Sequence, residues 1–181
     1  MDISVIKGKL VNDFNGIKIG SDKAPKRLIE FINLRCPYCK QWFEESYDVL
    51  TQAVAEGKVQ RIIKLLDKDK ISLQRGNIMH EYIDTDPKKA LTQIQLAFET
   101  QSVWQDFELE AVAEYAEKTL GFNQQANQIL QSEIRNEAEQ ANIKFVPIIV
   151  LGEHIFDESI DETTLKSYTV SYTHLTLPTT E

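Results

Sequence analysis

The chain has 181 residues, of which 42% are hydrophobic, so it can bury one sizeable core as a single domain or as one domain with an insertion. Its formal net charge of −8 argues against nucleic acid as the main partner and against electrostatic binding to an anionic membrane. No apolar run is long enough to span a bilayer. Residues 1–9 lack the basic start, apolar stretch and cleavage site of a secretory signal, so we expect a cytoplasmic protein.

A strand and a helix are predicted in direct succession in the first third of the chain. Residues 27–33 form a short, apolar, partly alternating run, which predicts a β-strand. Residues 36–56 change to helical spacing, and Gly57 is typical of a residue that ends a helix. The apolar positions of this helix recur three and four residues apart, at Trp42, Phe43, Tyr47, Val49, Leu50, Ala53 and Val54.

The only two cysteines of the chain, Cys36 and Cys39, lie where this strand gives way to the helix. A Cys-x-x-Cys pair can open and close a disulfide. At a helix N-terminus, unpaired backbone N–H groups and the positive end of the helix dipole favour a thiolate. Pro37 suits the first helical turn, where its missing N–H is not needed. We therefore predict an acidic, exposed Cys36 that attacks a disulfide, and a deeper Cys39 that resolves the mixed disulfide.

Two other uses of such a pair compete with redox activity. A structural zinc site needs about four ligands, and only His80, His154 and His174 could join the cysteines, without the usual paired spacing. A structural disulfide between residues this close would close too small a loop to stabilise the fold much. The order of strand, motif and helix favours redox chemistry, for which we expect neither a metal nor a cofactor.

The next segments predict a second strand and a helical region. Residues 59–66 form an apolar run that should lie parallel to the first strand across the helix, as a βαβ unit. From about residue 72 to residue 141 the pattern is helical almost throughout, and its amphipathic stripes predict the core faces of a small helical bundle. Three helices are expected in this region. The first starts at a cap and first-turn proline, Thr85-Asp86-Pro87, and the other two span residues 106–120 and 123–141.

Sheet character returns in two short runs near the C-terminus. Residues 145–151 and 154–156 are joined by the turn Gly152-Glu153, which predicts a β-hairpin. Pro147 can be an ordinary residue at a strand start or sheet edge. Alternatively, it can follow a cis bond in a tight turn that faces the cysteine pair. Both interpretations of Pro147 are open at this point.

The end of the chain divides into a helix and a segment of different composition. Residues 157–168 predict a last helix that covers the sheet, with Ser159 or Asp161 as its cap. Residues 169–181 are rich in threonine, contain no lysine or arginine and show no helical period. They are typical of a non-native, frame-shifted end, with a genuine flexible tail as the alternative. If this end is non-native, His174 has no functional role.

The order of features along the chain resembles the disulfide oxidoreductase A (DsbA-like) branch of the thioredoxin superfamily, over about residues 16–168. The resemblance implies an α/β thioredoxin fold with a helical domain inserted between the second and third core strands. Residues 1–69 and 143–168 would then form the thioredoxin-like domain, and residues 70–142 the insertion. The features that carry the resemblance are the approach at residues 19–25, Glu30-Phe31, the motif Cys36-Pro37-Tyr38-Cys39, the long insertion and Phe145-Val146-Pro147.

The resemblance also implies roles for single residues. Cys36 would be the nucleophile and Cys39 the resolving thiol, beside a cis Val146–Pro147 bond where Val146 presents backbone groups to an extended substrate. Glu30 matches the family's buried acid beneath the active site. Desolvation favours the neutral form of a carboxylate, which would suit Glu30 to exchange a proton with Cys39. The alternative is an ordinary strand acid that faces outward.

Further residues are candidates for tuning the thiols. Pro37 and Tyr38 lie between the cysteines and should set how well the Cys36 thiolate is stabilised. Arg35 would add positive charge beside Cys36. His80 could flank the cysteines and stabilise the thiolate, or it could be a surface or cap residue.

These features favour a thiol-disulfide oxidoreductase that acts on protein thiols and disulfides and is restored by a redox partner. A cytoplasmic member would reduce or isomerise disulfides, or serve an oxidative-stress response, rather than oxidise folding proteins. One alternative is a non-catalytic thioredoxin-fold binding module whose cysteines form a redox latch. Another is a glutathione-dependent reductase, since glutaredoxins share Cys-Pro-Tyr-Cys, although they lack such an insertion. Substrate, direction of exchange and oligomeric state do not follow from the sequence.

Overall fold

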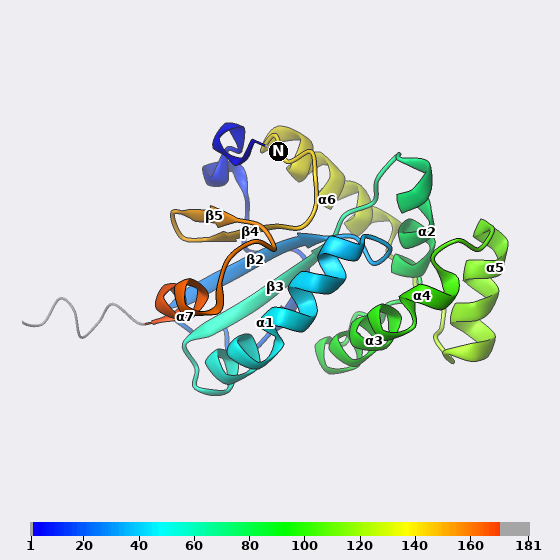
Figure 1. Cartoon of the computed structure of the whole chain (residues 1–181), viewed down its shortest axis with the longest axis horizontal. Coiled ribbons are helices and arrows are strands. Elements are labelled where there is room, and N and C mark those ends of the chain that lie inside the picture. The colour runs from blue at the N-terminus through cyan, green and yellow to red at the C-terminus, as the bar shows by residue number, and fades with distance from the viewer. Residues whose placement is uncertain (1, 171–181) are drawn as a thin grey trace, which may run out of the picture.

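The computed structural model describes residues 2–170, which form a five-stranded mixed sheet with helices on both faces (Figure 1). The strand order is β1-β3-β2-β4-β5. Strands β2 and β3 are parallel and the other neighbours are antiparallel, which confirms the predicted βαβ unit and the C-terminal hairpin. The strands are β1 (Ile17–Ile19), β2 (Lys26–Ile32), β3 (Val59–Leu65), β4 (Ile148–Leu151) and β5 (His154–Phe156).

Helix α1 (Pro37–Ala55) connects β2 to β3 and covers one face of the sheet (Figure 1). Its apolar residues recur at helical spacing, so one side of the helix is buried while the other stays in solvent. Gly57 follows with a φ of 73°, a left-handed conformation that glycine adopts without steric cost at the end of a helix. The buried side consists of Cys39, Trp42, Phe43, Ser46, Val49, Leu50 and Ala53.

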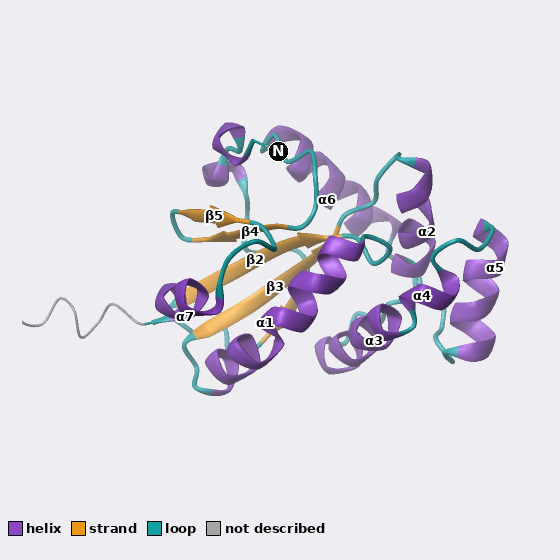
Figure 2. Cartoon of the chain, viewed as in Figure 1, coloured by secondary structure: helices purple, strands orange, loops and turns teal. Residues whose placement is uncertain are grey.

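The helical insertion between β3 and β4 is confirmed. Figure 2 shows that α2 to α5 form a group beside the sheet, whereas α6 lies along the face opposite α1. Lys64 of β3 is anchored to that helix by an ion pair in which its Nζ lies 2.7 Å from a Glu137 carboxylate oxygen. The elements are α2 (Ile71–His80), α3 (Pro87–Glu99), α4 (Gln101–Trp104), α5 (Leu109–Glu114), a π-helical turn η3 (Tyr115–Thr119) and α6 (Gln128–Gln140).

The boundaries of these helices differ from the sequence-based expectation. The stretch expected over residues 106–120 is divided between α5 and the π-helical turn, and α6 starts five residues later than expected, at Gln128. In the segment before α6, hydrogen bonds to the end of α2 are made where helical hydrogen bonds were expected. The N–H of Gln125 donates to the Glu81 carbonyl at 2.7 Å, and the Asn127 side chain donates to the His80 carbonyl at 3.1 Å.

The start of α3 agrees with the sequence in part. Asp86 is the N-cap residue and Pro87 the first helical residue, as predicted. The Asp86 side chain, however, makes no capping hydrogen bond. Its own backbone N–H donates instead to Asp84 Oδ1 at 2.8 Å, so the turn before the helix is fixed by Asp84.

The two ends of the described chain pack against the sheet layers. Two 3-10 turns, η1 (Ile3–Val5) and η2 (Gly8–Leu10), precede β1 and lie near α6 (Figure 1). The last helix, α7 (Glu162–Thr169), contacts α1, and Asp161 caps it by accepting the Thr164 N–H at 2.7 Å, which confirms one of the two predicted caps. Most of the predicted non-native tail, from residue 171 onward, lies outside the described residues.

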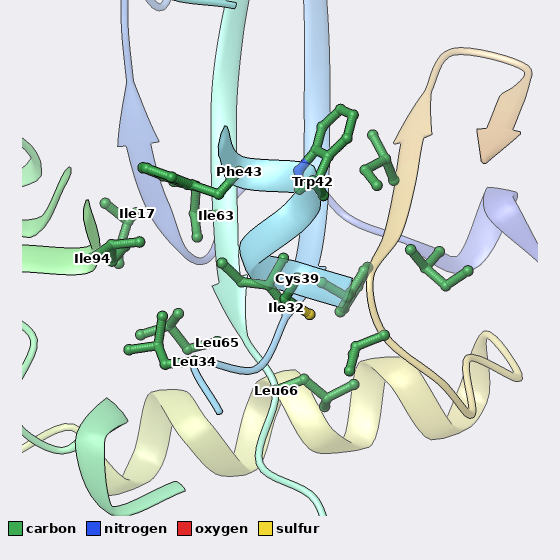
Figure 3. Packing of buried hydrophobic residues seen from close by; sticks show 14 of the residues in the cluster. Ile17, Ile32, Leu34, Cys39, Trp42, Phe43, Ile63, Leu65, Leu66 and Ile94 are labelled. Atoms are coloured by element: carbon green, nitrogen blue, oxygen red, sulfur yellow. The ribbon is translucent and has the colours of Figure 1, made fainter. Parts of the chain in front are cut away.

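The core is continuous from the sheet into the insertion. Figure 3 shows Cys39, Trp42 and Phe43 of α1 against the sheet, with Ile94 of α3 beside Ile17 of β1. The insertion therefore shares buried apolar surface with the thioredoxin-like part, which stabilises their mutual arrangement. None of the helices in residues 2–170 is long and apolar enough to cross a membrane.

Candidate active site

The two cysteines lie at the start of α1. Cys36 is the N-cap residue in an extended conformation, and Pro37 occupies the first helical position. The Cys36 N–H donates to the Asn33 carbonyl at 3.0 Å, which closes a tight loop between the end of β2 and the helix. The strand thus delivers Cys36 to the helix N-terminus, as the sequence predicts.

Both cysteines are free thiols, and both are buried. Cys39 is fully buried, as its deeper position in the helix predicts. Cys36 is only 6% exposed, so the prediction of an exposed nucleophile is wrong. The segment before β4 covers it, with the Val146 carbonyl oxygen 3.7 Å from Cys36 Sγ. Tyr38, between the cysteines, is 55% exposed and forms the accessible part of the motif.

The two thiols differ in acidity. A hydrogen bond from the Cys39 thiol, assisted by the backbone N–H groups of Cys39 and Tyr38, lowers the pKa of Cys36 to about 7, although burial opposes this shift. Burial raises the pKa of Cys39 well above its usual value, and the hydrogen bond with Cys36 and the Cys36 charge raise it further. Near neutral pH, Cys36 therefore carries most of the thiolate, and Cys39 holds its proton.

The segment opposite the cysteines supplies backbone groups to the site. The Val146–Pro147 peptide bond is cis, and Pro147 directly precedes β4. Because the Val146 carbonyl faces Cys36 Sγ, a substrate at this thiol would also meet the backbone of residue 146. The substrate-binding role of Val146 and Pro147 stays a prediction.

Glu30 is fully buried in β2, which excludes the outward-facing alternative. Its carboxylate accepts two hydrogen bonds from the Arg61 guanidinium, each at 2.8 Å, and one from Trp42 Nε1 at 2.9 Å. Three hydrogen bonds, two of them from the ion pair with Arg61, thus satisfy this buried carboxylate. Sequence reasoning missed Arg61, and the proton exchange between Glu30 and Cys39 stays a prediction.

His80 contacts the loop that precedes Cys36. It is fully buried in α2, which excludes the surface alternative, and its Nε2 accepts the Leu34 N–H at 3.1 Å. Its Nδ1 lies 2.7 Å from Asp67 Oδ1. Since a backbone N–H can only donate, Nε2 is the acceptor, and the proton of the neutral ring is on Nδ1. His80 thus fixes the Leu34 backbone. Neither of its two hydrogen bonds is the predicted contact with the Cys36 thiolate.

Asn33, in the loop between β2 and α1, is a second residue that sequence reasoning missed. Its Nδ2 donates to the Leu66 carbonyl at 3.1 Å, and its Oδ1 accepts the Arg35 N–H at 2.9 Å. Its backbone N–H donates to Cys39 Sγ at 3.4 Å. Gly76 of α2 makes room for this side chain, because a Cβ there would lie 1.9 Å from Asn33 Oδ1. A glycine inside a helical pattern is the one signal that could have indicated a close approach.

The short helix α4 supplies the remaining contacts of the loop. Buried Gln101 donates from Nε2 to the carbonyl oxygens of Leu34 at 2.8 Å and Cys36 at 3.3 Å. Arg35 donates from Nε to the Gln105 carbonyl at 3.0 Å and forms an ion pair with Asp106 at 3.1 Å. These contacts hold the Arg35 guanidinium against the insertion. Its predicted effect on the acidity of Cys36 stays a prediction.

Comparison with known proteins agrees with this geometry. The sequence model of a thioredoxin family matches residues 13–169, and the solved structures of similar fold include the thiol-disulfide exchange protein alpha-DsbA2 from Wolbachia pipientis. The chain belongs to the DsbA-like thioredoxin family. No curated protein matches the sequence of this DsbA-like chain.

Three solved structures illustrate how this DsbA-like protein relates to others. A conserved protein of unknown function from Enterococcus faecalis V583 is 54% identical, with a TM-score of 0.92, over 93% of this chain and 97% of that one. BdbD from Bacillus subtilis is 16% identical, with a TM-score of 0.62, over 85% and 90% of the two chains. A putative protein-disulfide isomerase from Pseudomonas syringae is 15% identical, with a TM-score of 0.67, over 86% and 98%. The last two likenesses show the fold alone.

The site of this DsbA-like protein combines an acidified thiol, a protonated partner thiol and a backbone carbonyl at the same sulfur. Within residues 2–170, no three His, Cys, Asp or Glu side chains lie together in a way that could hold a metal ion. The arrangement is suited to thiol–disulfide exchange, in which a thiolate attacks one sulfur of a disulfide and a second thiol displaces it.

Proposed function

We propose that the protein is a thiol-disulfide oxidoreductase that exchanges disulfides with protein substrates through Cys36 and Cys39. The observation that carries this proposal is the difference in acidity between two neighbouring buried thiols. The pKa of Cys36 is lowered to about 7, and that of Cys39 is raised well above its usual value. A purely structural thiol pair needs no such difference, whereas a nucleophile and a resolving thiol do.

The reaction follows from the two protonation states. The Cys36 thiolate attacks a substrate disulfide, which releases one substrate sulfur as a thiolate and leaves the other bonded to Cys36. Cys39 then loses its proton and attacks Cys36 Sγ, which forms the Cys36–Cys39 disulfide and releases the second substrate thiolate. Two electrons pass from the dithiol to the substrate disulfide. A dithiol or glutathione partner returns them in the next cycle.

We further propose that the protein works in the cytoplasm in the reducing or isomerising direction. Support comes from the acidity of the nucleophile. A Cys36 pKa of about 7 is near that of thioredoxin, whereas a strong oxidant such as DsbA has a thiol pKa of about 3.5. A less stabilised thiolate makes the reduced form a better electron donor, which suits a compartment that keeps thiols reduced.

The test is the redox equilibrium of the Cys36/Cys39 couple with glutathione, combined with catalysed reduction of insulin disulfides. We expect a reversible disulfide with a potential between roughly −200 and −270 mV and insulin reduction that is lost in Cys36→Ser. A potential near roughly −120 mV would reverse the proposed direction. If no reversible disulfide forms, the oxidoreductase proposal fails and a binding module with the same fold takes its place.

A further inference from the structure

Helices α1 and α3 meet at a small pocket with aromatic walls and a volume of about 220 Å³ (Figure 1). The ring centroid of Phe43 lies 5.7 Å from that of Tyr47 and 5.3 Å from that of Phe98. Phe43 and Phe98 are buried, whereas Tyr47 is half-buried, so its ring is reachable from solvent. Small-molecule sites usually measure roughly 300–1,000 Å³, so this pocket has the size for one side chain.

Both walls of the pocket lead to the nucleophile. With 3.6 residues per turn, Phe43 and Tyr47 lie within about 20° of Cys36 around the axis of α1. A rise of about 1.5 Å per residue places them roughly 10 Å and 16 Å from Cys36 along that axis. On the other wall, Glu99 ends α3 two residues before Gln101, whose amide donates to the Cys36 carbonyl at 3.3 Å. A substrate held at Cys36 therefore lies within reach of the pocket.

Acidic side chains border the aromatic rings, and none of the residues that line the pocket is basic. The three acids are exposed, and none forms an ion pair or a side-chain hydrogen bond within residues 2–170. Because their charges have the same sign, a cation in the pocket would be attracted by all three. The acids are Glu44 and Asp48 of α1 and Glu99 of α3.

The surrounding charges leave these acids uncompensated. The last turn of α3 contains no basic residue, although the C-terminal end of a helix favours a cation. Arg61 lies 5.6 Å from the Phe43 centroid, but its charge is matched by the buried carboxylate of Glu30. A guanidinium can stack on an aromatic ring and pair with carboxylates at the same time, whereas an ammonium acts as a point charge. The pocket is therefore suited to an arginine side chain.

We propose that this pocket binds an arginine of a protein substrate, roughly three to five residues from the substrate cysteine that Cys36 attacks. The inference rests on the proposed oxidoreductase function and adds a substrate class to it, namely proteins with an arginine near the reactive disulfide. The spacing follows from the geometry. An extended chain rises about 3.3 Å per residue, so the distance of roughly 10–16 Å along α1 corresponds to three to five residues.

The test uses peptides that differ in one group. Each peptide contains one cysteine, joined in a mixed disulfide to a coloured aromatic thiol. Arginine, or its neutral isostere citrulline, stands either about four or about ten residues from that cysteine. The Cys36 thiolate attacks the peptide sulfur, so that a bond from Cys36 to the peptide forms and the aromatic thiolate leaves. Its absorbance gives the rate constant of the first step with reduced protein in excess.

For the wild type, we expect the peptide with arginine about four residues away to react roughly tenfold faster than its citrulline counterpart at low salt. This ratio should approach one when the arginine is about ten residues away, and it should fall at high salt because the acids are exposed. Tyr47→Leu should lower the ratio in part, since it removes the ring on which the guanidinium stacks.

The double variant Asp48→Asn, Glu99→Gln should bring the ratio close to one. Its matched control is Glu133→Gln, Glu139→Gln, which removes two exposed acids of α6 and the same net charge and should keep the wild-type ratio. Ratios that are equal in the two double variants, or equal rates of the arginine and citrulline peptides with the wild type, would overturn the inference and leave the oxidoreductase proposal intact. If no peptide releases the aromatic thiolate, the oxidoreductase proposal is wrong, and the inference fails with it.

Discussion

Arg61 and Glu30 form a two-point ion pair in the interior of the protein, with both N–O distances at 2.8 Å and both side chains buried. The two residues lie diagonally on neighbouring parallel strands, since Leu28 is the register partner of Arg61 and Ile63 that of Glu30. Arg61 also lies over the Phe43 ring of α1, 5.6 Å from its centroid. The pair therefore ties both central strands to the helix that carries the cysteines.

We predict that Arg61→Met destabilises the fold by about 3–5 kcal/mol, because it leaves the Glu30 carboxylate buried without its cation. The measurement is urea unfolding near neutral pH. The double variant Glu30→Leu, Arg61→Met removes both charges and should recover most of the lost free energy of unfolding. If the single variant unfolds at the wild-type urea concentration, the pair does not have the structural role that its geometry indicates.

The acidity of Cys36 depends on its neighbour. The hydrogen bond from Cys39 is the largest cause of the lowered Cys36 pKa, so we predict that Cys39→Ala raises that pKa from about 7 toward the ordinary thiol value. Alkylation of Cys36 by iodoacetamide should rise with pH through the pKa, because the thiolate is the reacting form. The midpoint of this curve should lie at higher pH in the variant.

Wild-type protein in this alkylation experiment should be half-reactive near pH 7. Lower pH protonates Cys36 and slows the reaction, and higher pH brings it to a plateau. Coincident curves for wild type and Cys39→Ala would mean that the helix N-terminus alone sets the acidity of Cys36.

The amide of Gln101 satisfies two buried carbonyl groups in the active-site loop, those of Leu34 and Cys36. We predict that Gln101→Met, which keeps the volume but removes the donor, costs about 1–3 kcal/mol of unfolding free energy. Gln128→Met is the matched control, since Gln128 is exposed at the first position of α6 and should change stability by less than about 0.5 kcal/mol. Equal effects of the two substitutions would contradict the assigned role of Gln101.

Local patterns in the sequence were sufficient to predict the strand before Cys36, the redox motif and the helix that follows. Alternation over residues 27–33 and helical spacing after Cys36 are short-range signals, and they place the thiols at the helix start. The burial of Cys36 was missed because the covering carbonyl belongs to Val146, 110 residues away. A single sequence carries no signal for such a pairing, except where a family resemblance supplies it.

Two supports of the loop, Asn33 and Gln101, were missed for the same physical reason, and His80 was named as a candidate without its contact to the Leu34 backbone. The three side chains make contacts across 33 to 67 residues, and polar side chains of this kind are more often found at the surface. The family resemblance implied a buried Glu30 while strand alternation left an outward-facing acid open, and neither could assign Arg61 as its partner. Strand alternation shows which residues share a face, and does not show which charges meet across strands.

Gly76 marks the closest approach between the insertion and the active-site loop. A Cβ at this position would lie 1.9 Å from Asn33 Oδ1 and 2.9 Å from the Arg35 backbone nitrogen, and the second of these atoms cannot swing away as a flexible side chain would. Alanine is otherwise the best helix former, so that in a free helix Gly76→Ala would be stabilising by about 1 kcal/mol.

We therefore predict that Gly76→Ala destabilises the protein despite its better helix propensity, by about 1–3 kcal/mol, because α2 must move away from the loop. The displacement should also disturb the hydrogen bond from the Asn33 N–H to Cys39 Sγ, so the pH dependence of Cys36 alkylation should change with it. Gly76→Ala combined with Asn33→Ala removes both obstructing side-chain atoms of residue 33, Oδ1 and Cγ, and comparison with Asn33→Ala alone tests whether the side chain or the Arg35 backbone is limiting. Recovery in the double variant identifies the Asn33 side chain, whereas a more stable single variant would show that the close approach of α2 to the loop is not a constraint in solution.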